Sequence, residues 1–366
     1  MKYIDDNRIV MTLDAGGTNF VFSAIQSAEE IVEPLSLPSN ADNLDLCLKS
    51  LVEGFKKIEK LLPERPVAIS FAFPGPADYP NGIIGDLGNL PAFRGGVALG
   101  PMLEAEFKLP VFINNDGDLY AYGEAIAGFL PYINQLLENA GSPKRFKNLV
   151  GFTLGTGFGG GIVRNGELFI GDNSGAGEVW LLRNKLNSEM NVEEGVSIRA
   201  VQREYARIEG STHEEWPTPK EIYEIATGTL QGNKEAAVAS YNRMGEVLGD
   251  AIANVLTLID GIAVIGGGVA GAASLFLPKM IEEMNSGYQN PEGNTYRRLA
   301  VRAFNLQDQQ QLTAFLKGAT REITVPGSSR KIAYDPLSRV GVGISKIGTS
   351  KAVSIGAYAF ALNQIS

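Results

Sequence analysis

The sequence contains almost no cysteine and almost no histidine, and each shortage excludes a class of site. A single cysteine, Cys47, allows no disulfide bond within the chain and no multi-cysteine metal cluster. A single histidine, His213, would have to serve any histidine-dependent triad, metal centre or acid–base pair. His213 lies in the polar stretch Ser-Thr-His-Glu-Glu-Trp-Pro, which is typical of a surface connection. General-base chemistry is therefore expected from a carboxylate.

The chain also lacks a cluster of positive charge and a long apolar segment. Acidic residues number 41 against 32 basic ones, which gives a formal net charge of -9. No block of lysine and arginine occurs, whereas a surface for nucleic acid or anionic lipid needs basic charge. The apolar run Ile9–Leu13 stops at once at Asp14 and is too short for a signal peptide or a membrane span. We expect a cytoplasmic protein that binds neither nucleic acid nor membrane.

Glycine, by contrast, is abundant, and its 43 residues gather in clusters that follow short apolar runs. The run Ile9–Leu13 leads into Asp-Ala-Gly-Gly-Thr-Asn at 14–19, and Phe20–Ile25 leads out of it, which predicts a β-hairpin. The same pattern recurs around Gly-Thr-Gly-Phe-Gly-Gly-Gly at 155–161, which indicates an internal duplication. A third cluster, Gly266–Gly268, follows the apolar run 261–265.

The remaining sequence alternates between short apolar runs and helical spacing. We predict strands at 66–73 and 110–114, and helices at 119–129, 192–208, 219–229, 234–258 and 352–362. The stretch 287–298 is polar and turn-rich, and 306–334 is ambiguous. This alternation predicts α/β layers, and 366 residues suffice for two packed cores. The first glycine turn returns into a strand, and no Gly-Lys-Ser/Thr ends a glycine run, so neither a dinucleotide-binding fold nor a Walker loop is expected.

The glycine clusters suit a phosphate ligand. In the first hairpin, backbone amides and the Thr18 hydroxyl can cradle phosphate oxygens, while Asp14 can hold the hydration shell of Mg²⁺. A plain glycine turn with an aspartate is the alternative. Six of the seven positions in the second cluster are glycine or threonine. So many glycines cost backbone entropy on folding, and proteins tolerate that cost where a ligand approaches the main chain. The third would let a flat ring lie against the backbone, although such runs also serve helix–sheet packing.

Together, the three clusters resemble the two phosphate loops and the adenosine loop of the sugar kinase/actin superfamily. More narrowly, the chain resembles the ROK family, which contains bacterial glucokinases, hexose and N-acetylhexosamine kinases, and sugar-responsive repressors. The resemblance runs from Ile9 to about Ala270 and resumes from Ser345 to Leu362. Further matching segments are Pro74-Gly-Pro76 with Gly82, Asn89-Leu-Pro91, Leu109-Pro-Val111, Asn115-Asp116 and Gly177-Glu178.

The resemblance implies a two-domain α/β fold of the sugar kinase/actin type, which is ribonuclease H-like, with a central interdomain cleft. The smaller domain would comprise residues 1–115 and 352–366 and carry the first phosphate loop. The larger domain would comprise 116–351 and carry the second phosphate loop and the adenosine loop. The resemblance also implies a homodimer, with ATP and a sugar as its small-molecule partners.

The same resemblance assigns site residues. Asp116 would be the catalytic base, because it matches the aspartate of the family's Asn-Asp pair; a helix N-cap is the alternative use of this residue. Asp118 is expected in a capping or solvent role. The sugar would contact Asn89, Asn115, Asp116, Glu178 and Glu193, with Glu194 as the alternative to Glu193. ATP would contact Asp14, Gly16, Gly17, Thr18, Asn19, Gly155, Thr156, Gly157, Gly160, Gly266, Gly267 and Gly268, with Mg²⁺ held by Asp14 through water.

The chain departs from the family pattern after Glu178. The family carries a histidine three positions further on, where this chain has Leu181, and then a cysteine-rich zinc motif, where this chain has no cysteine. We therefore expect no zinc site. Trp180 could cover a sugar face, but packing is the favoured expectation. The region 306–344 is an extension relative to the family, and the sequence assigns it no function.

The expected function is ATP-dependent phosphorylation of a hexose, glucose or a related aldohexose, at the 6-hydroxyl. An N-acetylhexosamine kinase, a non-catalytic sugar-binding regulator and an actin-type ATPase are the alternatives. ROK repressors carry an N-terminal helix-turn-helix, whereas the first phosphate strand here begins at Ile9. The Asn115-Asp116 pair and Glu178 favour a sugar substrate over a plain ATPase.

Overall fold

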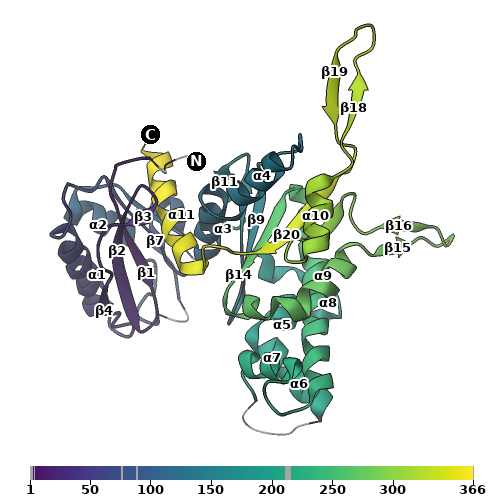
Figure 1. Cartoon of the computed structure of the whole chain (residues 1–366). Coiled ribbons are helices and arrows are strands. Elements are labelled where there is room, and N and C mark those ends of the chain that lie inside the picture. The colour runs from purple at the N-terminus through teal and green to yellow at the C-terminus, as the bar shows by residue number, and fades with distance from the viewer. Residues whose placement is uncertain (1–2, 4, 76, 88–89, 211–215, 366) are drawn as a thin grey trace. The chain divides into compact units, whose positions relative to one another are not determined.

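The computed structural model describes residues 3, 5–75, 77–87, 90–210 and 216–365. Contacts within the chain group it into two compact units (Figure 1). The first comprises Met1–Pro131, Gly161–Gly177 and Ile347–Ser366, and the second comprises Tyr132–Gly160 and Glu178–Lys346. This grouping differs from the expected boundary at residues 115 and 116, because it keeps the segment after Asp116 with the first unit.

The first unit is built on a sheet with the strand order β3-β2-β1-β5-β8, in which β4 also pairs with β2. Strands β1 and β2 are antiparallel, as the hairpin prediction required, and β1, β5 and β8 run parallel. The bounds are β1 Val10–Ala15, β2 Asn19–Gln26, β3 Glu29–Glu30, β4 Leu35–Pro38, β5 Ala68–Ala72 and β8 Val111–Asn114. The parallel strands β1, β5 and β8 therefore end at one edge of the sheet.

Helices and short strands complete this unit. They are α1 Leu44–Glu59, β6 Ala77–Asp78, η1 Tyr79–Asn81, β7 Ile83–Ile84, α2 Leu99–Phe107, α3 Asp116–Ile126, β11 Glu167–Leu168 and α11 Thr349–Gln364. Helix α4 (Phe129–Asn139) contains the boundary between the units at Pro131. One face of the sheet packs on α1 through aromatic rings: Phe22 meets Phe55 edge to face, and Phe55 in turn contacts Phe71. These rings are fully buried and supply a large share of the hydrophobic stabilisation of this core.

Glycine brings α3 and α11 into backbone contact. A Cβ atom at Gly123 would lie 1.9 Å from the Ala352 carbonyl oxygen, and one at Gly356 would lie 1.9 Å from the Leu119 carbonyl oxygen. Each helix therefore presents a glycine to the backbone of the other, which no larger residue permits. This packing holds α3 and α11 together within the first unit.

The second sheet has the order β11-β10-β9-β14-β20-β17, which repeats the plan of the first sheet, a hairpin followed by parallel strands. Strand β14 is parallel to β9 and to β20, and β17 is parallel to β20. The bounds are β9 Leu149–Leu154, β10 Phe158–Arg164, β14 Ile262–Gly266, β17 Arg302–Asn305 and β20 Arg339–Ile344. The shared strand order agrees with the internal duplication inferred from the glycine clusters.

The helices predicted at 192–208, 219–229 and 234–258 are present in the second unit, whereas α9 and α10 were not predicted. The predicted helix 192–208 is two helices with a break at Ser197, whose backbone is extended. Helix α7 begins at a capping box between Thr218 and Glu221, and α8 begins at an Asn233 cap. The bounds are η2 Val179–Leu181, α5 Glu193–Val196, α6 Ile198–Glu209, α7 Pro219–Thr227, α8 Lys234–Ile259, η3 Gly268–Ala272, α9 Ala273–Met284 and α10 Gln309–Lys317.

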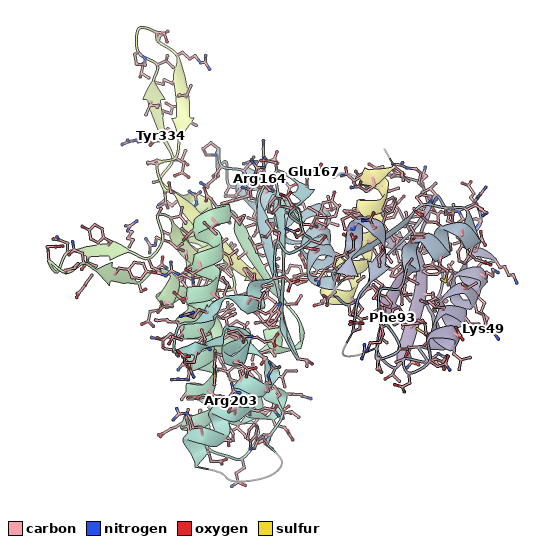
Figure 2. The ribbon with its side chains drawn as sticks, turned by 180° about the vertical axis from the view of Figure 1, so that it is seen from behind. Lys49, Phe93, Arg164, Glu167, Arg203 and Tyr334 are labelled. Carbon is pink, nitrogen blue, oxygen red and sulfur yellow. The ribbon has the colours of Figure 1, made fainter. Side chains whose placement is uncertain are left out.

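Three two-stranded hairpins complete the second unit. They are β12 Arg183–Asn184 with β13 Asn187–Asn191, β15 Gly287–Gln289 with β16 Thr295–Arg297, and β18 Arg321–Thr324 with β19 Lys331–Tyr334. Hairpins β15–β16 and β18–β19 project from the second unit beside α9 and α10 (Figure 1), and Tyr334 marks the base of the latter (Figure 2). The turn-rich stretch 287–298 and most of the ambiguous stretch 306–334 therefore correspond to α10 and these projections. Among the described residues, no helix combines the length and the apolar character that crossing a bilayer requires.

Candidate active site

The first glycine hairpin joins β1 to β2 in the first unit. A Cβ atom at Gly16 would lie 2.8 Å from the Asn19 carbonyl oxygen, so the turn closes only with glycine there, whereas Gly17 has nothing within 4 Å of that position. The hairpin is held from behind by Ser39, whose hydroxyl donates to the Gly17 carbonyl at 2.6 Å. The backbone amide of Ser39 donates to the Thr18 carbonyl at 3.0 Å. Ser39 is fully buried, and sequence reasoning missed its role because serine is common in turns.

Two carboxylates lie at the edge of the first sheet where its parallel strands end. Asp14 is near the end of β1, and Asp116 follows β8. Loss of surrounding water raises the pKa of Asp14 above its ordinary value, and the negative charge of Asp116 raises that pKa further. The Asp14 side chain is nevertheless accessible, and within the described residues none donates a hydrogen bond to its carboxylate. The position is therefore rich in negative charge and open to a cation.

Helix α3 begins directly at the predicted catalytic pair. Asn115 is its N-cap, and the Asn115 side chain accepts a hydrogen bond from the Gly117 amide at 2.8 Å. Asp116 is the first helical residue, and its Oδ1 accepts from the same amide at 2.9 Å. The alternative that Asp116 itself caps the helix is therefore wrong, because Asn115 does so. The solvent-facing alternative for Asp118 is also wrong, since only 3% of that residue is exposed.

The second glycine loop lies in the second unit, between β9 and β10. Gly155, Thr156 and Gly157 form its turn, and the Gly155 amide donates to the Gly157 carbonyl at 3.0 Å. Gly160 lies within β10 rather than in the turn. At the base of the loop, the rings of Phe152 and Phe158 stack with centroids 5.8 Å apart. The sequence cluster therefore divides into a short turn and a glycine-rich strand.

The third glycine cluster packs directly against the second loop. Gly266 ends β14, and Gly267 has a φ of +87°, which favours glycine. A Cβ atom at Gly267 would lie 2.2 Å from the Leu154 carbonyl oxygen, whereas Gly268 has nothing within 4 Å. The second unit therefore brings the predicted phosphate loop and the predicted adenosine loop side by side.

The predicted sugar contacts of the second unit are Glu178 and Glu193. The Glu178 Oε2 atom accepts a hydrogen bond from the indole Nε1 of Trp180. Trp180 is 36% exposed, so it lies at the surface of the unit beside Glu178. Leu181, at the position of the family's histidine, is 60% exposed. Asn89 of the predicted sugar set lies outside the described residues.

The neighbouring glutamates Glu193 and Glu194 face different partners. Glu193 accepts from the Phe158 amide at 2.9 Å through Oε2 and pairs with Arg199 at 2.7 Å through Oε1. Glu194 pairs with Arg199 and, at 2.9 Å, with Arg203 of α6. Arg203 is labelled in Figure 2. Hydrogen bonds from Arg199 and then Arg203 lower the pKa of the Glu194 carboxyl. Glu193 is therefore the one of the two that faces the glycine loop.

The donor set fits Mg²⁺ better than a metal that needs a full protein cage. Mg²⁺ keeps several waters and takes one or two carboxylates together with substrate phosphates, which suits Asp14 beside Asp116. In the part of the chain that the structure describes, no three His, Cys, Asp or Glu side chains are placed to hold a metal together.

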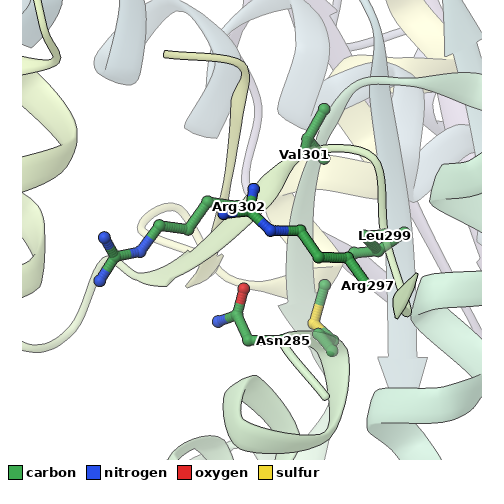
Figure 3. Close-up of a pocket in the computed structure, with 6 residues that line it drawn as sticks. Asn285, Arg297, Leu299, Val301 and Arg302 are labelled. Atoms are coloured by element: carbon green, nitrogen blue, oxygen red, sulfur yellow. The ribbon is translucent and has the colours of Figure 1, made fainter. Parts of the chain in front are cut away.

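A cavity of about 240 Å³ in the second unit contains none of the predicted site residues (Figure 3). It is lined by Met284, Asn285, Arg297, Leu299, Val301 and Arg302.

Comparison with known proteins identifies the family. The ROK family model matches residues 10–313. The crystal structure of a glucokinase from Parabacteroides distasonis is 57% identical, covers 99% of both chains and superposes with a TM-score of 0.91. An N-acetyl-D-glucosamine kinase from Vibrio parahaemolyticus is 27% identical over 288 residues, which are 73% of this chain and 87% of the relative. A ROK glucokinase from Streptomyces griseus, solved with glucose and AMPPNP, has 17% identity, 96% and 98% coverage and a TM-score of 0.58. The chain belongs to the ROK family and has its actin-like two-domain fold.

Proposed function

We propose that the chain is an ATP-dependent sugar kinase that transfers the γ-phosphoryl group to the 6-hydroxyl of glucose or a related aldohexose. The observation that carries the proposal is the pair of carboxylates Asp14 and Asp116 at one sheet edge, beside a glycine hairpin. The 57% identity to the Parabacteroides distasonis glucokinase supports glucose as the substrate. The Streptomyces griseus relative, solved with glucose and AMPPNP, supports a nucleotide as the phosphoryl donor.

The nucleotide would be held mainly by backbone. Gly17 and Gly155 have no atom within 4 Å of the position of a Cβ, so phosphate oxygens can approach the main chain there. Gly268 is equally open beside the second loop and would face the adenosine. Asp14 would hold Mg²⁺ through water, and the ion would neutralise charge on the outer phosphates. No side chain of the loops needs to react, because phosphoryl transfer depends on positioning and charge.

Asp116 would act as the general base. Its carboxylate takes the proton of the 6-hydroxyl as that oxygen attacks the γ-phosphorus in line, and the bond from phosphorus to the β,γ-bridging oxygen breaks to release ADP. The N-cap bond of Asn115 and the first turn of α3 hold the Asp116 carboxylate in place. Asn89, Asn115, Glu178 and Glu193 would contact the sugar hydroxyls. The homodimer, the cytoplasmic location and the expected domain boundaries remain predictions.

A second substrate class has its own support. The Vibrio parahaemolyticus relative is named an N-acetyl-D-glucosamine kinase and is covered over 87% of its length. An N-acetylhexosamine is therefore the alternative sugar. A non-catalytic regulator and a plain ATPase remain the alternatives to a kinase, and neither would release ADP in response to a sugar.

Sugar-dependent ADP release tests the proposal. The purified chain, with Mg²⁺ and ATP, is offered a panel of aldohexoses and N-acetylhexosamines. We expect release that depends on the sugar and that is fastest with glucose or a close relative. Release without sugar would support an ATPase, and none with any sugar would support a regulator.

The Asp116→Asn variant tests the assigned base. It should bind sugar normally and lose about 10²-fold or more in kcat, because the amide cannot accept the proton. Glu59→Gln is the matched control, since Glu59 is an exposed residue at the end of α1, and the chain passes from there to the edge where β1 and β5 begin, opposite the edge that carries the site. Near-normal turnover of Asp116→Asn would remove Asp116 from the mechanism.

A further inference from the structure

The second glycine loop is held by the junction of α5 and α6 through bonds to consecutive peptide groups. The Ile198 amide donates to the Gly155 carbonyl at 2.9 Å, and Arg199 Nη1 donates to the Thr156 carbonyl at 3.0 Å. From the same junction, Glu193 Oε2 accepts from the Phe158 amide at 2.9 Å. A Cβ atom at Gly157 would lie 2.7 Å from Glu193 Oε2, so this carboxylate also lies against the loop backbone.

These bonds determine where the loop amides point. In a trans peptide the C=O and the following N–H point in opposite directions. With the Gly155 and Thr156 carbonyls directed at α6, the amides of Thr156 and Gly157 are directed away from it. Neither amide donates a hydrogen bond to another described residue. The loop therefore presents two adjacent donors on the face opposite α6, the arrangement that a phosphate group needs.

Arg199 is the centre of this arrangement. Besides the Thr156 carbonyl it contacts Glu193 at 2.7 Å and Glu194 at 2.6 Å. Glu194 is in turn held by Arg203. The hydrogen bonds that Arg199 donates to Glu194 and then to Glu193 raise the pKa of its guanidinium, which stays charged. One planar guanidinium thus donates hydrogen bonds to the loop carbonyl and to both carboxylates. The ammonium group of a lysine would reproduce this set of bonds poorly.

We propose that Arg199 is a positioning residue that holds the second glycine loop with its amides ready for the phosphates of the nucleotide. The inference rests on the proposed function for the identity of the ligand. A free loop of glycine and threonine would sample many backbone states. The free-energy cost of ordering that loop would then weaken the binding of ATP. Arg199 and Glu193 restrict those states before the nucleotide arrives. Arg199 acts through the backbone of Thr156 and needs no contact with a substrate.

The kinetic test compares Arg199→Met and Arg199→Lys with Arg207→Met. Arg207 lies about two turns further along α6, and its side chain, which is 63% exposed, pairs with Glu204 of the same helix and not with the loop, so its variant is a matched control. We expect Arg199→Met to raise KM for ATP about ten-fold, an effect reduced by the partial exposure of the side chain. KM for the hexose should rise less, because Glu193, the proposed sugar contact, keeps its bond from the Phe158 amide. Arg199→Lys should recover part of the loss, and Arg207→Met should match the wild type.

A second readout does not depend on turnover. Hydrogen exchange of the Gly155 and Phe158 amides, the two in this loop that donate hydrogen bonds, should be at least several-fold faster in Arg199→Met than in the wild type. AMPPNP titrated by calorimetry should bind about ten-fold more weakly. Should Arg199→Met fail to fold, Arg199→Lys carries the same two measurements. If the wild type shows no sugar-dependent ADP release while these two effects appear, the proposed kinase function fails and the role of Arg199 stands. Unchanged exchange and unchanged AMPPNP affinity would overturn the inference, whatever the activity.

Discussion

Replacing Gly123 with alanine should damage both the stability of the first unit and the proposed catalysis. Gly123 lies in the middle of α3, where alanine is ordinarily better than glycine by about 1 kcal/mol. Here, however, the new Cβ would lie 1.9 Å from the Ala352 carbonyl oxygen of α11, well under any real contact distance. The colliding atom is backbone, so the helices would have to separate by more than about 1 Å. Overpacking of this kind outweighs the gain in helix propensity.

The magnitude follows from these opposing effects. A clash with a backbone atom belongs in the upper part of the overpacking range, about 2–3 kcal/mol, and the propensity gain offsets about 1 kcal/mol of it, so we expect a net loss of about 1–2 kcal/mol. Helix α3 also begins with Asn115 and Asp116. A shift of about 1 Å at reacting groups can cost about 10²-fold in rate. Gly123→Ala should therefore lower kcat more than its loss of stability explains.

Urea unfolding followed by circular dichroism measures the first effect, and sugar-dependent ADP release measures the second. Gly175→Ala is the control, because Gly175 has nothing within 4 Å of its Cβ position and no positive φ. Gly356→Ala should reproduce the defect from the other helix, since its Cβ would lie 1.9 Å from the Leu119 carbonyl oxygen. A Gly123→Ala protein as stable and as active as the wild type would refute the reasoning about this contact.

Two further predictions concern the charge and the aromatic group at the site. Because the pKa of Asp14 is raised, its charged form costs stability at pH values above that pKa, and the cost disappears as the pH falls below the ordinary value of 3.8. Asp14→Asn should therefore stabilise the ligand-free chain at pH 7 by at most about 1 kcal/mol after solvent screening, and it should weaken the stabilisation by Mg²⁺ and ATP. Thermal unfolding at pH 7 and pH 4 should show a smaller gain in stability at the lower pH. An equal gain at both pH values would contradict this account of Asp14. Trp180 is one of two tryptophans, so in a Trp216→Phe background its fluorescence reports on the surroundings of Glu178. Adding the preferred hexose should change that emission in a saturable way, and an unchanged spectrum at saturating sugar would argue against Glu178 as a sugar contact.

Much of the fold was predictable, because local pattern reflects local structure. Apolar runs followed by glycine turns marked both hairpins, and strands β5, β8 and β14 lie where apolar runs predicted them. The projecting hairpin β18–β19 was not predictable. Its strand residues are exposed on both faces, so the alternation that marks a half-buried strand is absent from its sequence.

The candidate site was predicted in part. The residue types of the first hairpin predicted a phosphate and Mg²⁺ role for Asp14, and the resemblance to the ROK family predicted the roles of Asn115 and Asp116. The burial of Asp118, the bond from Trp180 to Glu178 and the clamp of Arg199 on Thr156 were not evident from sequence. Each depends on which segments pack together, and periodicity reports that a side chain is buried or exposed without naming its partner.

The sequence by itself determined where phosphates can approach the main chain closely, because a glycine has no side chain to block that approach and can be identified without knowing its neighbours in space. Tertiary structure alone decided how those loops are held. Ser39 supports the first loop from 22 residues away in the chain, and Arg199 supports the second from 43 residues away. Contacts between residues so far apart in the chain form only when folding brings the two segments together, and no local propensity encodes them.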